Sequence, residues 1–578
     1  MERTGAAQQG ALNGLVGVGS IVRKEMYYMR HVAARRGLAA AVCAALACTG
    51  AAAFAAPSLA RPGADIAGQT PASEIGIEDR TPSYQQDGYD AQFSVTNFIL
   101  EAPDLTLDKE ALSAILEAGM GDGKTIGDLR RTVDALTTYC RTHGYPAAAA
   151  YLPPQESADG VVVLRILPGH YGEITIENNS RLKTPVAKRI IAGLKEGDII
   201  TTSKLETALY LVSDATGARA VGVLSPGAEF GTSKLTVRIE DSKESNTVFY
   251  VENYGSPNTG RYRYGLQETL YNPSGTGDKV SAGALISNGS LRNFYANYET
   301  VVGRGGTTLG VGIARMNYEI GGALSAIGAE GKSLTFSLFG QTPLYHRTNR
   351  SLTMRYGYNY RDLNDDITAF GLEGKKHTHS VYLGVAGTQR MYRATLDYNA
   401  NLTVGRLNYD SEYSSILGAL SQTDEGTYAK FEADLTAVQQ LGSTTDFLVK
   451  VSGQKASRNL DSSEEFYLGG PNGVRAYAQG EGAGDEGLLG TAELRWHAPV
   501  RGLTLSTFYD VGTARLSRSR IADDNSVTLR GWGVAAAYSN PGDWFARLDY
   551  ARRIGLDSSV AAKNSARGRL WFLMGKIW

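Results

Sequence analysis

The sequence predicts a mainly β protein, with a sixteen-stranded transmembrane β-barrel that follows two periplasmic α/β domains. From about residue 246 to Trp578, apolar and polar residues alternate with the period of two that is typical of strands. After Pro57 no run approaches about 18 consecutive apolar residues, so any later membrane span must be made of strands. Residues 90–242 instead mix short strand patterns with amphipathic helices.

The N-terminal region has the features of a secretion signal. Arg30, Arg35 and Arg36 precede an alanine-rich apolar run, which the A-x-A sequence of residues 53–55 follows. The run is short of the roughly 20 strongly apolar residues of a membrane anchor, so we predict a signal peptide within residues 1–56. Residues 1–25 add nothing that a signal needs, and a start assigned too far upstream is one explanation for them.

Composition gives few hints about partners. The formal net charge of −1 over 578 residues does not suggest nucleic acid. Cys43 and Cys48 lie in the expected signal, which leaves Cys140 without a partner for an internal disulfide. Residues 57–89 contain four prolines and few large apolar groups, so we expect a periplasmic linker there.

Two similar units follow the linker, at residues 90–170 and 171–242. Each has the predicted order strand, helix, helix, strand, strand. The second helix of the first unit opens at Thr125, with Asp128 in capping-box position, and Ser203 with Glu206 repeats this pattern 78 residues later. The expected elements are 93–100, 109–117, 125–143, 147–152 and 161–167, then 174–176, 186–194, 203–213, 219–224 and 234–240.

The barrel region, residues 243–578, separates two kinds of side chain. Within residues 351–361, five large apolar side chains from Leu352 to Tyr360 would face one way, and polar side chains such as Arg355 and Arg361 the other. One face suits hydrocarbon and the other suits water, and a barrel of sixteen strands leaves an aqueous channel. The segments begin near Thr247, Tyr262, Asp278, Asn293, Thr307, Lys332, Ser351, Lys376, Arg393, Thr427, Thr445, Gly487, Gly502, Val527, Trp544 and Arg567.

Residues 466–487 form a glycine-rich excursion between the eleventh and twelfth of these segments, with Arg475 in its middle. A structureless loop beyond about 12–15 residues is uncommon unless it is functional or disordered. In the next strand but one, the alternation points Asp510 inward, and a guanidinium can meet a carboxylate through two parallel hydrogen bonds. Two interpretations stay open: a loop folded into the channel and held by Arg475 and Asp510, or a solvated Arg475 in an extracellular loop.

The same residues carry a resemblance to a known family. Phe466-Tyr467-Leu468-Gly469-Gly470 and Val474-Arg475-Ala476-Tyr477, with Phe508-x-Asp510-x-Gly512 downstream, resemble the paired signature of two-partner secretion transporters, the outer-membrane pores of the filamentous haemagglutinin and haemolysin secretion family. Tyr151-Leu152-Pro153-Pro154-Gln155 resembles a motif of that family's first periplasmic domain. Asn253-Tyr254-Gly255-Ser256 and Thr259-Gly260-Arg261-Tyr262 resemble the start of its barrel.

The resemblance implies two POTRA (polypeptide-transport-associated) domains at 90–170 and 171–242, and an outer-membrane barrel whose loop 457–486 folds into the lumen. It implies export of a large exoprotein, which the POTRA domains recognise by its N-terminal secretion domain and which passes unfolded through the pore. Outer-membrane lipid and the barrel-assembly machinery are further expected partners; cofactors, metals, nucleotides and enzymatic activity are not expected. The implied site residues are Gly469, Gly470, Val474, Arg475, Tyr477, Phe508, Asp510 and Gly512 for the pore lock, Tyr151, Leu152, Pro153, Pro154 and Gln155 in the POTRA motif, and Phe572 and Trp578 in the C-terminal strand.

Two departures from the family pattern qualify these expectations. Ala476 stands where the family most often has glycine, and alanine is strained there if the position needs a positive φ. The family commonly has an N-terminal helix that plugs the barrel, whereas residues 57–89 offer no convincing amphipathic helix.

Other functions fit the sequence less well. A barrel-assembly factor shares the loop motif but would be expected to have more than two POTRA units, and a solute porin has no use for about 150 periplasmic residues. Residues 119–125 imitate a phosphate loop, but Ala118 replaces its first glycine, so we expect a turn and a helix cap at Lys124 and Thr125. His377 and His379 could share a strand face, but no third metal ligand is near them in the sequence.

Overall fold

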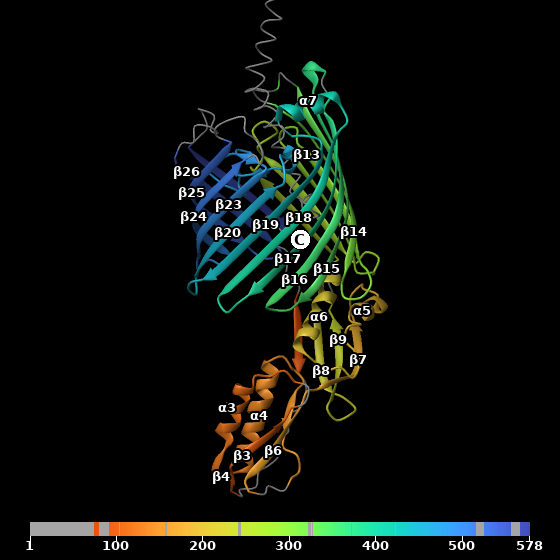
Figure 1. Cartoon of the computed structure of the whole chain (residues 1–578), viewed down its shortest axis with the longest axis vertical. Coiled ribbons are helices and arrows are strands. Elements are labelled where there is room, and N and C mark those ends of the chain that lie inside the picture. The colour runs from red at the N-terminus through yellow and green to blue at the C-terminus, as the bar shows by residue number, and fades with distance from the viewer. Residues whose placement is uncertain are drawn as a thin grey trace, which may run out of the picture.

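The chain forms an elongated molecule, in which two small α/β units lie one beyond the other at one end of a β-barrel (Figure 1). The computed structural model describes residues 74–79, 92–102, 105–155, 159–240, 244–321, 325, 328–371, 373–421, 423–515, 525–555 and 567–578. The predicted signal peptide lies outside these residues. Within them, no helix combines the length and the apolar character needed to cross a membrane.

The first α/β unit packs two helices against a small sheet. Strand β3 runs parallel to β6, and β5 pairs with the other side of β6 in the antiparallel sense. The predicted capping box is present, because the side chains and backbones of Thr125 and Asp128 bond reciprocally at the start of α4. The elements are β2 (Phe93–Val95), β3 (Asn97–Glu101), α3 (Lys109–Gly119), β4 (Gly121–Lys124), α4 (Ile126–Thr142), β5 (Ala149–Tyr151) and β6 (Val161–Leu167).

The second unit contains an element that the sequence analysis missed. Strand β1 (Ile75–Asp79), within the predicted linker, joins the sheet of this unit in parallel with β8, giving the order β1-β8-β9-β7. Ile75 and Ile77 pack against the core of the unit, which explains why so short a strand is held. The other elements are β7 (His170–Asn178), α5 (Thr184–Ile190), α6 (Thr202–Thr216), β8 (Ala220–Pro226) and β9 (Thr232–Ile239).

The predicted cap of the second unit's long helix was wrong by two residues. Thr201, not Ser203, is the N-cap of α6, and its hydroxyl accepts a hydrogen bond from the Lys204 amide at 3.4 Å. Three consecutive hydroxyl residues, Thr201 to Ser203, can each serve as a cap, so the sequence pattern alone did not distinguish them.

The barrel is closed by sixteen strands, as predicted, and the first strand, β10, pairs with the last, β27. The largest error in a predicted start is at β15, which begins at Ala329 instead of Lys332. The strands are β10 (Ser245–Glu252), β11 (Arg263–Tyr271), β12 (Asp278–Ser287), β13 (Arg292–Val301), β14 (Thr308–Glu319), β15 (Ala329–His346), β16 (Arg350–Ile367), β17 (Lys375–Arg390), β18 (Ala394–Tyr409), β19 (Gly426–Gln440), β20 (Thr445–Ala456), β23 (Glu486–His497), β24 (Leu503–Arg515), β25 (Ser526–Ser539), β26 (Trp544–Arg553) and β27 (Gly568–Ile577).

The two faces of the barrel wall differ as the alternation predicts. Large apolar side chains such as Leu338, Leu383 and Trp532 are about half exposed on the outer surface, where they suit lipid. Polar side chains such as Asn359, Arg361 and Lys430 alternate with them and are buried on the inside. The wall is therefore apolar outside and polar inside.

The second α/β unit docks on the barrel through α6. The Thr207 hydroxyl donates to the carbonyl of His346 at 3.0 Å, and Glu206 accepts from the amide and hydroxyl of Thr348 at 3.2 and 2.7 Å. The side chain of Asn272, in the β11–β12 turn, donates to the carbonyl of Ala215 at 3.0 Å. These contacts place the unit directly under the turns at this end of the barrel (Figure 1).

Candidate functional site

The loop between β20 and β23, residues 457–485, packs against inward-facing residues of the barrel; we call it the lumenal loop. It contains a short 3-10 helix, η5 (Ser462–Glu464), and a small ribbon of β21 (Phe466–Tyr467) and β22 (Ala483–Gly484). Leu468, Val474 and Ala476 are fully buried, and Arg475 is 4% exposed. A solvated extracellular loop would not bury these side chains, so the geometry favours the folded-back interpretation.

Arg475 is bound to Asp510 of β24 by three hydrogen bonds. Its Nε and Nη2 lie 2.9 Å from the two carboxylate oxygens, and its backbone amide donates to Oδ2 at 3.1 Å. Asp510 is completely buried and also accepts from the hydroxyl of Thr491 at 2.9 Å. Both oxygens of the carboxylate are therefore satisfied in the paired geometry that guanidinium groups favour.

Two further carboxylates meet the same guanidinium. Nη1 of Arg475 lies 3.2 Å from Glu493 of β23 and 3.0 Å from Asp549 of β26. The face of Phe508 lies 3.2 Å from the guanidinium carbon, in a cation–π arrangement. We call Arg475 with Asp510, Glu493 and Asp549 the Arg475 lock. It joins the loop to three strands of the barrel wall.

The alternation of the sequence pointed Asp510 inward, but no role was predicted for Glu493 of β23 or Asp549 of β26. The alternation within β26 could have indicated Asp549. Arg547 and Asp549 share the inward register, while Leu548 and Tyr550 are exposed. Arg547 also lies 2.8 Å from Asp549, so the lock contains a second cation.

The tip of the lumenal loop, residues 474–481, reaches the last two strands of the barrel. Trp571 of β27 donates its indole N–H to the carbonyl of Arg475 at 2.7 Å. Arg553 of β26 donates to the carbonyl of Ala476 at 3.3 Å and forms an ion pair with Glu481 at 3.1 Å. Its guanidinium also lies over the ring of Tyr477, at 4.3 Å.

Ala476 has no strained backbone. Among the described residues the non-glycine positions with positive φ are Asp159 and Asn272, so the strain considered for Ala476 does not arise. A carbon added at Gly531 would lie 2.6 Å from the Ala476 methyl group, well inside van der Waals contact. The absence of a side chain at Gly531 therefore makes room for the alanine.

The other sequence-predicted residues of the pore lock surround the arginine. They belong to one buried apolar cluster in the lumen or adjoin it. Gly470 has a φ of 127°, and carbons added at Gly469 or Gly512 would lie 2.5 Å from the Ala478 carbonyl oxygen and 2.9 Å from Leu468. The cluster consists of Phe466, Leu468, Val474, Ala476, Tyr477, Leu489, Phe508, Ala514, Leu529, Ala535 and Ala551.

The lumenal loop has a second anchorage at its root, residues 461–464. Glu464 lies 2.9 Å from both Arg361 of β16 and Lys430 of β19. Asp461 lies 2.7 Å from Lys376 of β17. All five side chains are nearly buried, and the sequence analysis did not anticipate them. The loop is thus held by strands β16, β17 and β19 at its root and by β23 to β27 at its tip.

The POTRA motif lies far from this site. Gln155 bonds the backbone of Val163 in β6, donating to the carbonyl at 2.8 Å and accepting from the amide at 2.7 Å, as a neighbouring strand would. Tyr151 meets Phe230 of the second unit edge to face at 5.9 Å, and Phe230 is 82% exposed. Leu152 is also exposed, so an apolar patch lies where the two units meet. Pro153 accepts from the Gln155 side chain, and Pro154 follows it in an exposed bend.

The C-terminal residues help to close the barrel. The amide of Phe572 donates to the side chain of Asn253 at 2.8 Å, and the amide of Trp578 donates to the carbonyl of Thr247 at 2.9 Å. Both bonds cross the seam between β27 and the first strand or the turn that follows it. Phe572 and Trp578 therefore lie apart from the lock. Trp571, by contrast, packs at the seam and also bonds the carbonyl of Arg475.

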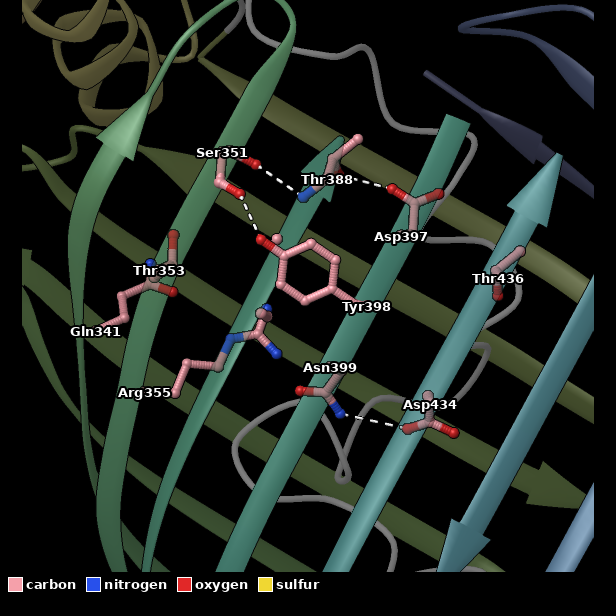
Figure 2. A pocket seen from close by; sticks show the side chains of 12 residues that line it. Gln341, Ser351, Thr353, Arg355, Thr388, Asp397, Tyr398, Asn399, Asp434 and Thr436 are labelled. Atoms are coloured by element: carbon pink, nitrogen blue, oxygen red, sulfur yellow. Dashed lines mark hydrogen bonds between the residues drawn. The ribbon is translucent and has the colours of Figure 1, made fainter. Parts of the chain in front are cut away.

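The opposite wall of the lumen is polar. A hollow of about 360 Å³ runs over strands β15 to β19. Figure 2 shows the hydroxyl of Thr388 bonded to Asp397 and the amide of Asn399 bonded to Asp434, with Arg355 nearby. Such a wall offers hydrogen-bond partners to water or to a passing polypeptide backbone.

The two histidines and the imitation phosphate loop take part in ordinary structural contacts. His377 bonds Asp410 at 2.7 Å, and His379 bonds the hydroxyl of Tyr358 at 2.6 Å. Among the described residues, no group of three or more potential metal ligands comes together. In the imitation phosphate loop, Thr125 is the N-cap of α4, as predicted, whereas Lys124 ends strand β4 where a turn was expected.

Comparisons with known proteins agree with the fold. The profile of the ShlB-type POTRA domain matches residues 93–169, and that of the haemolysin secretion/activation protein ShlB/FhaC/HecB matches residues 231–538, more than half of the chain. The heme/hemopexin transporter protein HuxB of Haemophilus influenzae (strain 86-028NP) is 26% identical over 509 residues, which are 86% of this chain and 89% of that protein. The outer membrane transporter CdiB of Dickeya dadantii (strain 3937) is 23% identical over 430 residues, 70% of this chain and 72% of that protein.

Solved structures show the same architecture. CdiB from Escherichia coli superposes with a TM-score of 0.65 at 17% identity, covering 86% of this chain and 93% of that one. BamA from Haemophilus ducreyi lacking POTRA domains 1–3 gives 0.52 at 15% identity, covering 84% of this chain and all of that one, and this likeness shows the fold alone. The chain therefore belongs to the ShlB/FhaC/HecB haemolysin secretion/activation family, and it is an outer-membrane transporter with periplasmic POTRA domains that exports a partner exoprotein by two-partner secretion.

Proposed function

We propose that the lumenal loop is the gate of a passive protein-conducting pore, and that the Arg475 lock holds the gate in its resting position. The observation that carries this proposal is a single buried guanidinium of the loop bound to carboxylates on three strands of the barrel wall. In this proposal the exoprotein passes unfolded and no nucleotide is hydrolysed. The transporter has no enzymatic activity of its own.

The energetics suit a gate. Removing one partner from a buried ion pair costs roughly 3–5 kcal/mol, because the remaining charge stays desolvated. Moving the whole loop into a wet lumen instead lets water replace the lost bonds on both sides. The docked loop is then stable at rest and can still be displaced when a substrate binds the open state better.

The apolar patch of Tyr151, Leu152 and Phe230 supports the POTRA domains as the exoprotein's receptor. It includes Tyr151 at the end of β5, where side chains of α4 already bond the Ala150 amide and the Ala148 carbonyl, so we expect a substrate segment to bind the patch through apolar side chains. We propose residues 90–170, 171–242 and 243–578 as the functional units of the chain. The apolar outer surface of the third contacts outer-membrane lipid, and the barrel-assembly machinery inserts it.

A reversible cross-link between loop and wall tests the gate. A carbon added at Gly512 lies 3.4 Å from Cγ2 of Val474, so cysteines at both positions are close enough for a disulfide. We expect the oxidised Val474→Cys, Gly512→Cys protein to export at least tenfold less exoprotein, and reductant to restore export. Each single variant treated with the same oxidant is the control. Normal export by the fully cross-linked protein would show that the loop does not need to move.

The POTRA patch makes a separate prediction. Phe230→Ser is expected to weaken binding of the exoprotein's secretion domain about tenfold, since burying a phenylalanine contributes about 1.5–3 kcal/mol. Binding to the full-length transporter in detergent can be measured by surface plasmon resonance. Ile99→Ser, which changes an exposed apolar residue on the opposite edge of the first sheet, is the matched control. Unchanged affinity in both Phe230→Ser and Leu152→Ser would rule out this patch.

A further inference from the structure

A small cavity lies where the tip of the lumenal loop meets the last strand and the turn after β10. It has a volume of about 50 Å³. Two arginines line it, Arg261 of the turn and Arg569 of β27, together with the side chain of Gln479 from the loop. None of the described residues that line the cavity is acidic. The other lining residues are Gly255, Pro257, Ala478, Leu570 and Trp571.

Glu481 of the loop tip attracts Arg569 electrostatically, but it makes its hydrogen bonds with other groups. Glu481 of the loop tip is engaged by Arg553, whose Nη2 lies 3.1 and 3.3 Å from its two oxygens. Glu481 also accepts a hydrogen bond from the Ala478 amide at 2.6 Å, which closes the turn of the tip. The described lining of the cavity contains two guanidinium groups and no carboxylate, so it favours a ligand that is negatively charged and accepts hydrogen bonds.

The size of the cavity limits the ligand. A cavity needs about 10–15 Å³ of this kind of volume to hold one water molecule, so this one holds roughly three or four waters or one tetrahedral oxyanion. Guanidinium groups bind phosphate through paired, charge-assisted hydrogen bonds. We propose that Arg261, Arg569 and Gln479 form a binding site for a phosphate-class oxyanion, either inorganic phosphate or the phosphate of a phosphomonoester.

The position of the site gives the ligand an effect on the loop. Its three polar groups come from three separate parts of the chain: the turn after β10, the loop tip and the last strand. An anion bound to all three needs the tip in the docked position. By linkage, a ligand that binds only the docked state stabilises that state in proportion to its concentration. The oxyanion therefore holds the lumenal loop closed, through contacts that are separate from the Arg475 lock.

The test uses the full-length transporter in detergent, with inorganic phosphate as the probe and chloride at equal ionic strength as the reference. We expect phosphate to raise the thermal unfolding midpoint of the wild type saturably and to broaden its ³¹P resonance. Arg569→Gln and Arg261→Gln should each weaken phosphate binding at least tenfold. Arg569→Lys, which keeps the charge but loses the paired donors, should be intermediate. Arg552→Gln, an exposed arginine on the neighbouring strand, should bind phosphate normally.

Two further experiments test where the bound phosphate comes from and whether it acts on the loop. Micelles of a phosphorylated glycolipid, compared with its dephosphorylated form, show whether a lipid phosphate reaches the site, because only the former should compete with inorganic phosphate. In single-channel recordings, phosphate should lower the frequency of openings of the wild type but not of Arg569→Gln. Equal phosphate affinity in the wild type, Arg569→Gln and Arg261→Gln would overturn the site. Binding with no effect on openings would leave the site standing and contradict its action on the gate.

Discussion

Arg475→Ala is expected to reduce secretion of the exoprotein at least tenfold and to increase the time that the pore spends open. The substitution leaves Asp510, Glu493 and Asp549 buried with Arg547 as the remaining cation of the lock. Loss of one partner from such an arrangement costs about 3–5 kcal/mol, which lowers the population of the docked loop by roughly a hundredfold or more. Exoprotein in the medium and channel conductance in planar bilayers measure the two effects.

Controls separate this effect from a failure to fold. The barrel should still reach the membrane, and the difference in gel mobility between heated and unheated samples reports its folding. Arg475→Lys should be intermediate, because an ammonium keeps the charge but cannot form the two parallel hydrogen bonds that the guanidinium makes with Asp510. Arg530→Ala, an exposed arginine on β25, should secrete normally. If Arg475→Ala and Asp510→Asn both export at the wild-type rate, the lock has no role in secretion.

Glu464→Gln is expected to free the root of the lumenal loop while its tip remains bound. The change removes a carboxylate that pairs with both Arg361 and Lys430, while Lys430 keeps Glu432 at 3.1 Å. Two buried cations then lose a charged partner, so the docking of the root should weaken by a few kcal/mol. Limited proteolysis within residues 457–465 of the folded protein should be about tenfold faster than in the wild type.

The matched control for the root is Lys455→Met. Lys455 also pairs with a carboxylate, Glu486, but its side chain is 66% exposed. Exposed ion pairs contribute about 0–1 kcal/mol, so this variant should be cleaved at the wild-type rate. Equal protection of the loop in Glu464→Gln would mean that the root is held by packing and backbone bonds instead of by charge.

The barrel could be predicted from the sequence because the pattern that indicates it lies within each strand. A wall between lipid and water forces an alternation that can be followed residue by residue, and the same alternation points Asp510 inward. The partners of the loop root could not be predicted in this way. Arg361 and Glu464 lie 103 positions apart and meet only because the barrel closes. Nothing in the local sequence of either residue indicates the other.

The missed strand β1 and the displaced helix cap have different causes. Strand β1 is five residues long in a proline-rich segment, and it depends on the free edge that β8 offers from another domain. The cap of α6 depended on a choice among adjacent hydroxyl residues that have nearly equal capping strength. At Ala476 the sequence correctly marked an unusual position, but its explanation, Gly531 on a different strand, required the structure.

The hydrogen bond from Trp571 to the carbonyl of Arg475 sets an order of events during biogenesis. Trp571 belongs to β27, the last of the barrel strands in chain order, which closes the ring against β10. The loop tip cannot complete its contacts until that strand is in place. A barrel that is still open at its seam therefore cannot shut its own channel, and the docked loop marks a barrel whose assembly is finished.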